Sequence, residues 1–293
     1  MVDLDASDRG TSMLVLGTAQ LGQRYGIANR EGQPDYRSAM RILQMAAEGG
    51  VAALDTAPAY GQSEALIGRA STAVPVYTKL SVDADPVESV ERSIRALCRP
   101  RVDLLFLHDP DLVVEDPDGV VDRAASLVGG PVRALGASVY SPVQLRSALL
   151  DPRIAAVQVP FSVVDRRALQ VDELRRTTKI VLARSVLLQG ALLLKPQAMP
   201  GHLQPLADIV ARVGGIARSL AVTPQAVLVL FARDSPGVTG VILGAETPSQ
   251  LRENIRLMQA PPLPGWASRE LQELPDMPPE VIDPRLWPVE SRR

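Results

Sequence analysis

The sequence predicts an α/β fold in which eight parallel strands close into a (β/α)8 TIM barrel. Short apolar segments recur along the chain, as is typical of parallel strands covered on both faces. Longer segments with helical periodicity separate them, and this alternation indicates a parallel sheet. The length of 293 residues suits one barrel domain. The predicted strands are 13–16, 52–55, 74–79, 102–107, 133–137, 155–159, 180–183 and 238–243.

The segments between the strands carry helix signals. Residues 38–48 repeat apolar side chains on one helical side. Three further helices are expected to begin where an N-capping side chain precedes a proline, at Asp85, Ser141 and Thr223. An open, doubly wound sheet is the competing fold, but it normally carries a glycine-rich phosphate turn after its first strand. Residues 16–22 read LGTAQLG and do not fit that turn, so the barrel is favoured.

The whole chain, residues 1–293, is predicted to form one domain, with the barrel over about residues 13–258. The first twelve residues are polar and are expected to be loose. Residues 259–293 hold eight prolines, which predicts a stiff, extended Pro-rich tail rather than another strand–helix unit. Two roles for this tail stay open: a wall of a binding site, or a cover on the barrel exterior.

Composition excludes several classes of function. The formal net charge is −2, and Lys and Arg are spread along the chain, so we expect no nucleic-acid partner and no membrane partner. The single cysteine, Cys98, excludes an internal disulfide, and no metal site is predicted. Cys98 is expected to be a small, buried filler in a helix. His202, in a breaker-rich loop, is interpreted as incidental. An acidic N-terminus and the lack of a long apolar run predict a soluble, cytoplasmic protein.

Four chemically capable side chains follow three successive predicted strands. Asp55 and Tyr60 lie in the loop after residues 52–55, Lys79 ends the next strand, and His108 ends the one after it. The carboxyl ends of barrel strands meet at one mouth, where such folds carry their chemistry. The sequence therefore predicts that these four side chains form one site.

Several motifs together resemble the aldo-keto reductase family. Residues 55–64, DTAPAYGQSE, look like the family signature, and Lys79 and His108 fall where the family keeps its other catalytic residues. Residues 244–254, GAETPSQLREN, are similar to its adenosine-binding segment. The resemblance runs from about residue 14 to residue 258. It implies a TIM-barrel, NAD(P)H-dependent oxidoreductase that reduces an aldehyde or ketone to an alcohol.

Elementary chemistry gives each of the four residues a role in such a reduction. The carbonyl oxygen needs a proton, and Tyr60 is predicted to be the general acid. An ordinary tyrosine has a pKa of about 10 and holds its proton firmly, but a neighbouring ammonium such as Lys79 favours the phenolate. Asp55 is expected to anchor Lys79 through a charge-assisted hydrogen bond. His108 is expected to orient the substrate oxygen or help relay the proton.

No amino-acid side chain can donate the hydride, so a cofactor must supply it. The resemblance implies a nicotinamide dinucleotide lying over the barrel mouth, with NADP(H) favoured over NAD(H). The residues that it assigns to cofactor binding are Gly17, Thr18, Asp55, Ser138, Gln158, Arg184, Ser185, Leu187, Gly190, Gly244, Ala245, Gln250, Glu253 and Asn254.

Four positions depart from the family pattern. Val139 replaces an asparagine next to Ser138, and Arg184 stands where an aromatic residue often stacks on the nicotinamide. A guanidinium plane can also stack, or it can point at the pyrophosphate. The lysine often found at Gly244 is absent, and Gln250 replaces an arginine of many NADPH-preferring members.

The predicted partner is a small carbonyl compound, and no oligomeric state is predicted. Residues 18–27, the loop after His108 and the tail are expected to recognise it. Residues 21–29, LGQRYGIAN, are polar and basic, which favours a hydroxylated or anionic substrate such as a sugar derivative. One alternative is a non-catalytic, cofactor-binding regulatory barrel. Another is a different nicotinamide-dependent step, such as a dehydrogenation or a redox-neutral rearrangement.

Overall fold

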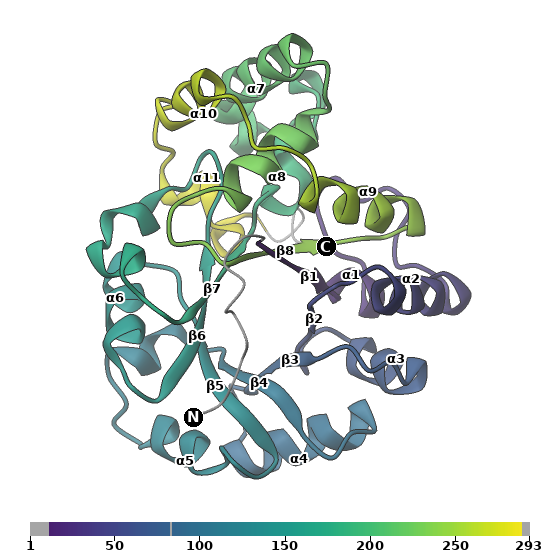
Figure 1. Cartoon of the computed structure of the whole chain (residues 1–293), viewed down its shortest axis with the longest axis vertical. Helices are drawn as coiled ribbons and strands as arrows, with labels where there is room; N and C mark the ends of the chain where they lie inside the picture. Colours follow the sequence, from purple (N-terminus) through teal and green to yellow (C-terminus); the bar gives the residue numbers. More distant parts are fainter. Residues whose placement is uncertain (1–11, 83, 289–293) are drawn as a thin grey trace.

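Eight parallel strands form a closed barrel whose order follows the chain (Figure 1). The computed structural model describes residues 12–82 and 84–288, so the expectation of a loose segment over the first twelve residues falls almost wholly outside the described residues. The predicted eight-stranded barrel is confirmed. The strands are β1 Met13–Gly17, β2 Ala53–Asp55, β3 Val76–Lys79, β4 Val102–Leu107, β5 Val132–Ser138, β6 Ile154–Pro160, β7 Ile180–Arg184 and β8 Gly240–Gly244.

Helices surround the barrel, and the three predicted N-caps are confirmed (Figure 1). The side chains of Asp85, Ser141 and Thr223 each accept a hydrogen bond from a backbone N–H in the first helical turn. The α-helices of the described residues are α1 Ala19–Gly22, α2 Tyr36–Glu48, α3 Ser63–Ala70, α4 Pro86–Leu97, α5 Val120–Ser126, α6 Pro142–Leu150, α7 Ala207–Ser219, α8 Pro224–Arg233, α9 Pro248–Met258, α10 Gly265–Gln272 and α11 Pro279–Ile282.

The connection between β6 and β7 differs from the predicted strand–helix alternation. It contains two 3-10 turns, Arg167–Gln170 and Asp172–Arg175, and no α-helix. In these turns only Ala168 and Leu174 are buried. The segment therefore lacks the apolar stripe that holds a full helix against the sheet.

A separate apolar cluster fills the inside of the barrel. Tyr77 and Phe106 meet edge to face with their ring centroids 6.2 Å apart. Gly136 makes room for them, since a Cβ there would lie 2.6 Å from the Phe106 ring. The buried members of the cluster are Val15, Ala53, Tyr77, Leu104, Phe106, Ala134, Ala156, Ile180 and Leu182. This cluster fills the barrel interior, so the residues at the carboxyl ends of the strands lie on a packed apolar layer.

Two local expectations were wrong. Cys98 is exposed, because it follows α4 as a left-handed cap with φ of 51° and does not continue the helix into the core. The Pro-rich tail is not simply extended: α10 and α11 lie in it, and their prolines stand at or just before the helix starts, where proline is tolerated. Trp287 is fully buried, so the tail packs on the barrel, and α10 lies beside α7 (Figure 1).

Among the described residues, no single helix has both the length and the apolar character needed to cross a bilayer. The segments Gly201–Ser219 and Pro224–Arg233 pass that test only as a pair bent by 95°.

Candidate active site

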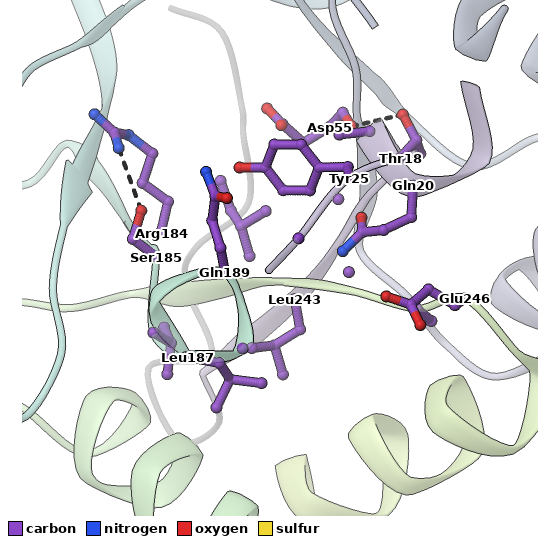
Figure 2. A pocket seen from close by; sticks show the side chains of 18 of the residues that line it. Thr18, Gln20, Tyr25, Asp55, Arg184, Ser185, Leu187, Gln189, Leu243 and Glu246 are labelled. Atoms are coloured by element: carbon purple, nitrogen blue, oxygen red, sulfur yellow. Dashed lines mark hydrogen bonds between the residues drawn. The ribbon is translucent and has the colours of Figure 1, made fainter. Parts of the chain in front are cut away.

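A cavity opens at the carboxyl ends of the strands, and it gathers the residues that the sequence analysis selected (Figure 2). Glu253 is the exception: its carboxylate pairs with Arg256 at 2.7 Å, and it does not line the cavity. The selected residues that do line it are Gly17, Thr18, Asp55, Tyr60, Lys79, His108, Ser138, Gln158, Arg184, Ser185, Leu187, Gly190, Gly244, Ala245, Gln250 and Asn254.

The strand pleat explains why these side chains meet. Successive strand residues point to opposite faces, so every second residue faces the barrel interior. Asp55, Lys79, His108, Gln158 and Arg184 each lie two positions beyond a residue of the interior apolar cluster. They therefore form the layer directly above that cluster, with one side chain from, or directly after, each of the strands β2, β3, β4, β6 and β7.

A buried ion pair lies at the centre of this layer. Lys79 Nζ donates to both carboxylate oxygens of Asp55, at 2.8 and 2.9 Å, and to the carbonyl of Thr56 at 2.9 Å. Gln158 Nε2 donates to Asp55 Oδ1 at 2.5 Å. The two charged side chains are only 3% and 6% exposed. Every donor of Lys79 is thus satisfied, which is the condition for a charge pair to be tolerated in the interior.

Tyr60 lies against this pair, but its acidity differs from the expectation. Lys79 Nζ is 4.8 Å from the centroid of the Tyr60 ring. Burial, followed by the Asp55 carboxylate, raises the pKa of Tyr60 well above its ordinary value, and Arg184 only partly opposes the rise. The expected lowering by Lys79 is absent because Asp55 neutralises the ammonium at close range. Tyr60 therefore keeps its proton at neutral pH.

His108 is the second titratable group in the cavity. Burial and then the positive charges of Lys79 and Arg184 lower the pKa of His108 to about 4. Its imidazole is consequently neutral at neutral pH, with one N–H donor and one acceptor nitrogen. A neutral imidazole can donate a hydrogen bond to a carbonyl oxygen.

Backbone packing between two loops fixes the place of Tyr60. Thr18 Oγ1 donates to the Asp55 carbonyl at 2.9 Å, and Ser63 Oγ donates to Thr18 Oγ1 at 2.7 Å. A Cβ on Gly22 would lie 1.8 Å from the carbonyl oxygen of Tyr60. Only glycine permits this approach, so the loop after β1 holds the loop after β2 in position.

Two buried side chains near the ion pair have the chemistry to hold an amide. Gln158 Oε1 is buried and has no hydrogen-bond partner among the described residues. Ser138, also buried, lines the same cavity, whereas the side chain of Val139 is buried in the apolar core. An orphaned acceptor of this kind is costly unless a ligand satisfies it. Gln158 and Ser138 therefore fit the carboxamide of a nicotinamide, and Val139 contributes nothing to it.

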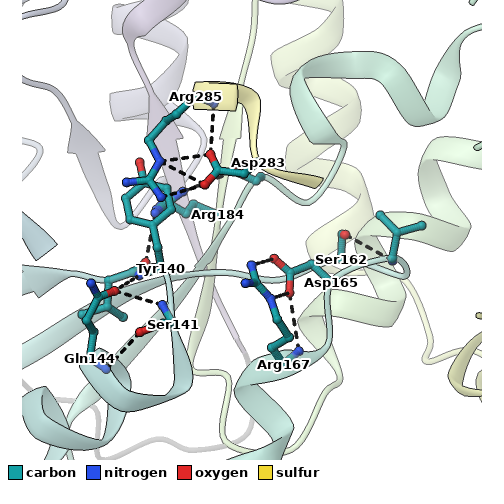
Figure 3. A network of polar contacts seen from close by, with 12 residues as sticks. Tyr140, Ser141, Gln144, Ser162, Asp165, Arg167, Arg184, Asp283 and Arg285 are labelled. Carbon is teal, nitrogen blue, oxygen red and sulfur yellow. Dashed lines mark hydrogen bonds and ion pairs between the residues drawn. The ribbon is translucent and has the colours of Figure 1, made fainter. Parts of the chain in front are cut away.

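Arg184 does stack on an aromatic ring, but the ring belongs to the protein. Its guanidinium lies 4.0 Å from the centroid of Tyr140 and donates to the Val139 carbonyl at 3.0 Å. From the other end of the chain, the Arg285 guanidinium lies 3.3 Å from the same centroid (Figure 3). The tail thus reaches a residue that lines the cavity, through Arg285, which Asp283 holds in an ion pair.

The loop after β7 has an unusual backbone along the cavity. Ser185, Leu188 and Gln189 are non-glycine residues with positive φ, and Gly190 follows with φ of 87°. Left-handed conformations cost free energy and are concentrated at ligand-binding sites. A Cβ at Gly190 would lie 2.6 Å from that of Ala28, so this loop packs on the loop after β1.

The sequence analysis did not assign several residues that line the cavity. Tyr25 belongs to the loop expected to recognise the substrate, so its position there was predictable in outline. Gln20 lies in the same loop and Glu246 in residues 244–254, whereas Tyr140, Gln189 and Gln225 carry no motif and depend on how the loops fold over the mouth. The lining residues that were not assigned individually include Gln20, Tyr25, Tyr140, Gln189, Gln225 and Glu246.

Comparison with known proteins agrees with this fold. A family model described as the aldo/keto reductase family matches residues 13–274. An uncharacterized oxidoreductase of Mycobacterium tuberculosis is 30% identical over 273 residues, covering 83% of each chain. Among solved structures, an aldo-keto reductase from Bacillus halodurans in its holo form superposes with a TM-score of 0.72 at 22% identity, covering 90% of this chain and 92% of the other.

A Klebsiella pneumoniae aldo-keto reductase solved in complex with NADPH superposes with a TM-score of 0.67 at 20% identity, covering 88% and 89% of the two chains. At such identities the solved structures bear on the fold. The family model covers nearly all of the barrel, from β1 to the end of α10. This chain therefore belongs to the aldo/keto reductase family of oxidoreductases.

Proposed function

We propose that this protein is an NAD(P)H-dependent reductase that converts an aldehyde or ketone to an alcohol, with Tyr60 as the general acid. The observation that carries the proposal is the fully hydrogen-bonded Lys79–Asp55 pair against the Tyr60 ring, with a neutral His108 in the same cavity. A nicotinamide dinucleotide, when bound, supplies the hydride. Gln158 and Ser138 would hold its carboxamide.

Each residue of the four has a defined task in this proposal. Tyr60 holds the proton that the carbonyl oxygen receives, because burial keeps its hydroxyl protonated. His108 donates an N–H to the same oxygen and so orients the carbonyl. Lys79 packs its ammonium against the Tyr60 ring and so holds the ring in place. Asp55 fixes Lys79 and keeps it from turning toward solvent.

A hydroxylated carbonyl compound, such as a sugar derivative, is the proposed substrate class. The cavity lining is rich in polar side chains, including Tyr25, Tyr140, Gln189 and Arg184, which can hydrogen-bond hydroxyl groups. As for the coenzyme, the resemblance favours NADP(H), and the Klebsiella pneumoniae relative was solved with NADPH. The charges at the far end of the cavity bear on that choice.

Cofactor binding followed by turnover tests the proposal. The purified chain is titrated with NADH and NADPH by fluorescence quenching, and oxidation of the reduced nicotinamide is then followed with aldehydes, ketones and aldoses. Binding with turnover of a carbonyl supports the reductase. Binding without turnover of any of them favours the non-catalytic regulatory barrel, and binding of neither dinucleotide contradicts both.

A further inference from the structure

The cavity continues from Tyr60 to the start of α9, and this far end has its own chemistry. Gln225, Glu246 and Asn254 line it there, and Gln225 Nε2 donates to Asn254 Oδ1 at 2.8 Å. A dinucleotide whose reactive ring lies at Tyr60 must place its adenosine at this other end. Figure 2 shows the two ends, with Arg184 on one side and Gln20 and Glu246 on the other.

The N-terminus of α9 would ordinarily attract a phosphate, but three of the N–H groups around it are already used by the helix cap. The backbone N–H groups of Glu246 and Thr247 both donate to Gln250 Oε1, at 2.6 and 3.3 Å. Gln250 N in turn donates to Thr247 Oγ1 at 3.2 Å, which completes a capping box. The side chain of Gln250 is therefore committed to the helix, and these donors are not free for an anion.

Within residues 12–82 and 84–288, no cationic side chain lines this end. Among the described residues that line the cavity, the only Lys and Arg are Lys79 and Arg184, and both lie at the catalytic end. Glu246 lines the far end instead, half-buried; burial, and then the neighbouring Glu31 carboxylate, raise its pKa, which the hydrogen bond with Gln250 partly opposes. The acidic groups at this end are thus Glu246 in the lining and Glu31 beside it.

Gln20 occupies the space where a longer side chain at position 244 would start. A Cβ on Gly244 would lie 2.2 Å from Gln20 Nε2. A basic side chain at this position would have to displace the flexible end of Gln20. Gly244 itself carries no charge, and the neutral amide of Gln20 fills the space beside it.

We propose that Glu246 selects NAD(H) over NADP(H) by accepting a hydrogen bond from the 2′-hydroxyl of the adenosine ribose and repelling a 2′-phosphate. An acidic side chain on this hydroxyl is a general solution for NAD, while a 2′-phosphate needs a cation. The pyrophosphate is common to both dinucleotides and does not affect the difference. This inference rests on the proposed function and reverses the coenzyme order that the resemblance favours.

Equilibrium binding tests the inference without turnover. Dissociation constants of NADH and NADPH are measured by the fluorescence of the bound reduced nicotinamide, and those of ADP-ribose and 2′-phospho-ADP-ribose by calorimetry. We expect the ligand without the 2′-phosphate to bind about tenfold tighter or more in each pair, and the ratio to shrink as salt is added. Equal affinities, or tighter binding of the phosphorylated ligands, would overturn the inference and leave the reductase intact.

Paired variants assign the effect to one carboxylate. Glu246→Gln should lower the NADH/NADPH affinity ratio by about threefold or more. Glu253→Gln, in the middle of α9 and paired with Arg256 outside the cavity, should leave the ratio unchanged. Glu31→Gln removes the exposed carboxylate near Glu246 and should lower the same affinity ratio by a smaller factor. Equal ratios in the Glu246 and Glu253 variants would overturn the role of Glu246, whereas binding of neither dinucleotide by the wild type would overturn the proposed function as well.

Discussion

Replacing Tyr60 by phenylalanine removes a single hydroxyl group and separates catalysis from folding. Within the described residues, this hydroxyl makes no hydrogen bond to the protein, and the contact with Lys79, 4.8 Å from the centroid, involves the ring that phenylalanine retains. The free energy of unfolding should therefore change by no more than about 0.5 kcal/mol. Dinucleotide affinity should also stay near that of the wild type.

The rate of reduction should fall much further. A positioned general acid typically contributes about 10² to 10⁴ in rate, which corresponds to roughly 3–5 kcal/mol of transition-state stabilisation. Because burial raises the pKa of Tyr60, the wild-type acid is protonated throughout the neutral range. The loss in kcat should accordingly be the same at each pH in that range.

The assay is turnover of the reduced nicotinamide with the best carbonyl substrate, together with urea unfolding and dinucleotide binding. Tyr25→Phe is the matched control, since Tyr25 lines the same cavity and burial also raises its pKa, but no cation–π contact joins it to Lys79. We expect the control to lose less than about tenfold in kcat. A similar loss in both variants, or a Tyr60 variant as active as the wild type, would refute the assignment.

Three further predictions concern stability, each measured by urea unfolding. The pKa of His108 is about 4 in the folded protein and 6.5 for a free histidine. Its neutral form therefore stabilises the fold above about pH 6.5, and that stability is lost as the pH falls toward 4. The variant His108→Gln should lose less stability than the wild type on acidification, and an equal loss would contradict this. Lys79→Met leaves Asp55 buried without its cation and should lower the free energy of unfolding by about 3–5 kcal/mol. The double variant, Lys79→Met with Asp55→Asn, should lower it by less. Losses that add up in the double variant would contradict the pairing. Gly68→Ala places a Cβ 2.4 Å from a backbone carbonyl oxygen of α4 and should cost about 1–3 kcal/mol. Gly214→Ala, with only an arginine tip 3.5 Å away, should instead gain up to about 1 kcal/mol, and equal effects would refute the close approach.

Most of the barrel was predictable because strand and helix signals agree along the chain. The segment 102–107 was predicted at the bounds that β4 has, and capping side chains located three helix starts. The exceptions lie where local signals are weak. Cys98 leaves its helix in a left-handed turn, which periodicity does not indicate. The charged segment between β6 and β7 forms 3-10 turns, although the alternation predicts a helix.

The candidate site was predictable for residues on strands and less so for residues on loops. Once the strands are known, the alternation of side chains along each strand predicts that Asp55, Lys79 and Gln158 lie in one layer. By contrast, the contact of Gly22 with the Tyr60 carbonyl joins two loops and needs coordinates. Glu246 shows no pattern of its own, and its effect depends on the commitment of Gln250 to the helix cap. The raised pKa of Tyr60 likewise depends on burial, which the motif does not encode.

The protonation states in the cavity favour one direction of the reaction. Reduction needs a protonated Tyr60 and a neutral His108, and burial produces both at neutral pH by raising one pKa and lowering the other. Alcohol oxidation needs the phenolate of Tyr60 as a base, which the same burial and the Asp55 carboxylate disfavour. The rate of oxidation should therefore keep rising with pH through pH 10, the ordinary pKa of a tyrosine, while the rate of reduction stays level across the neutral range. Initial rates in both directions over this range test the argument, and oxidation that is fastest near neutral pH would show that Tyr60 loses its proton far more easily than its burial allows.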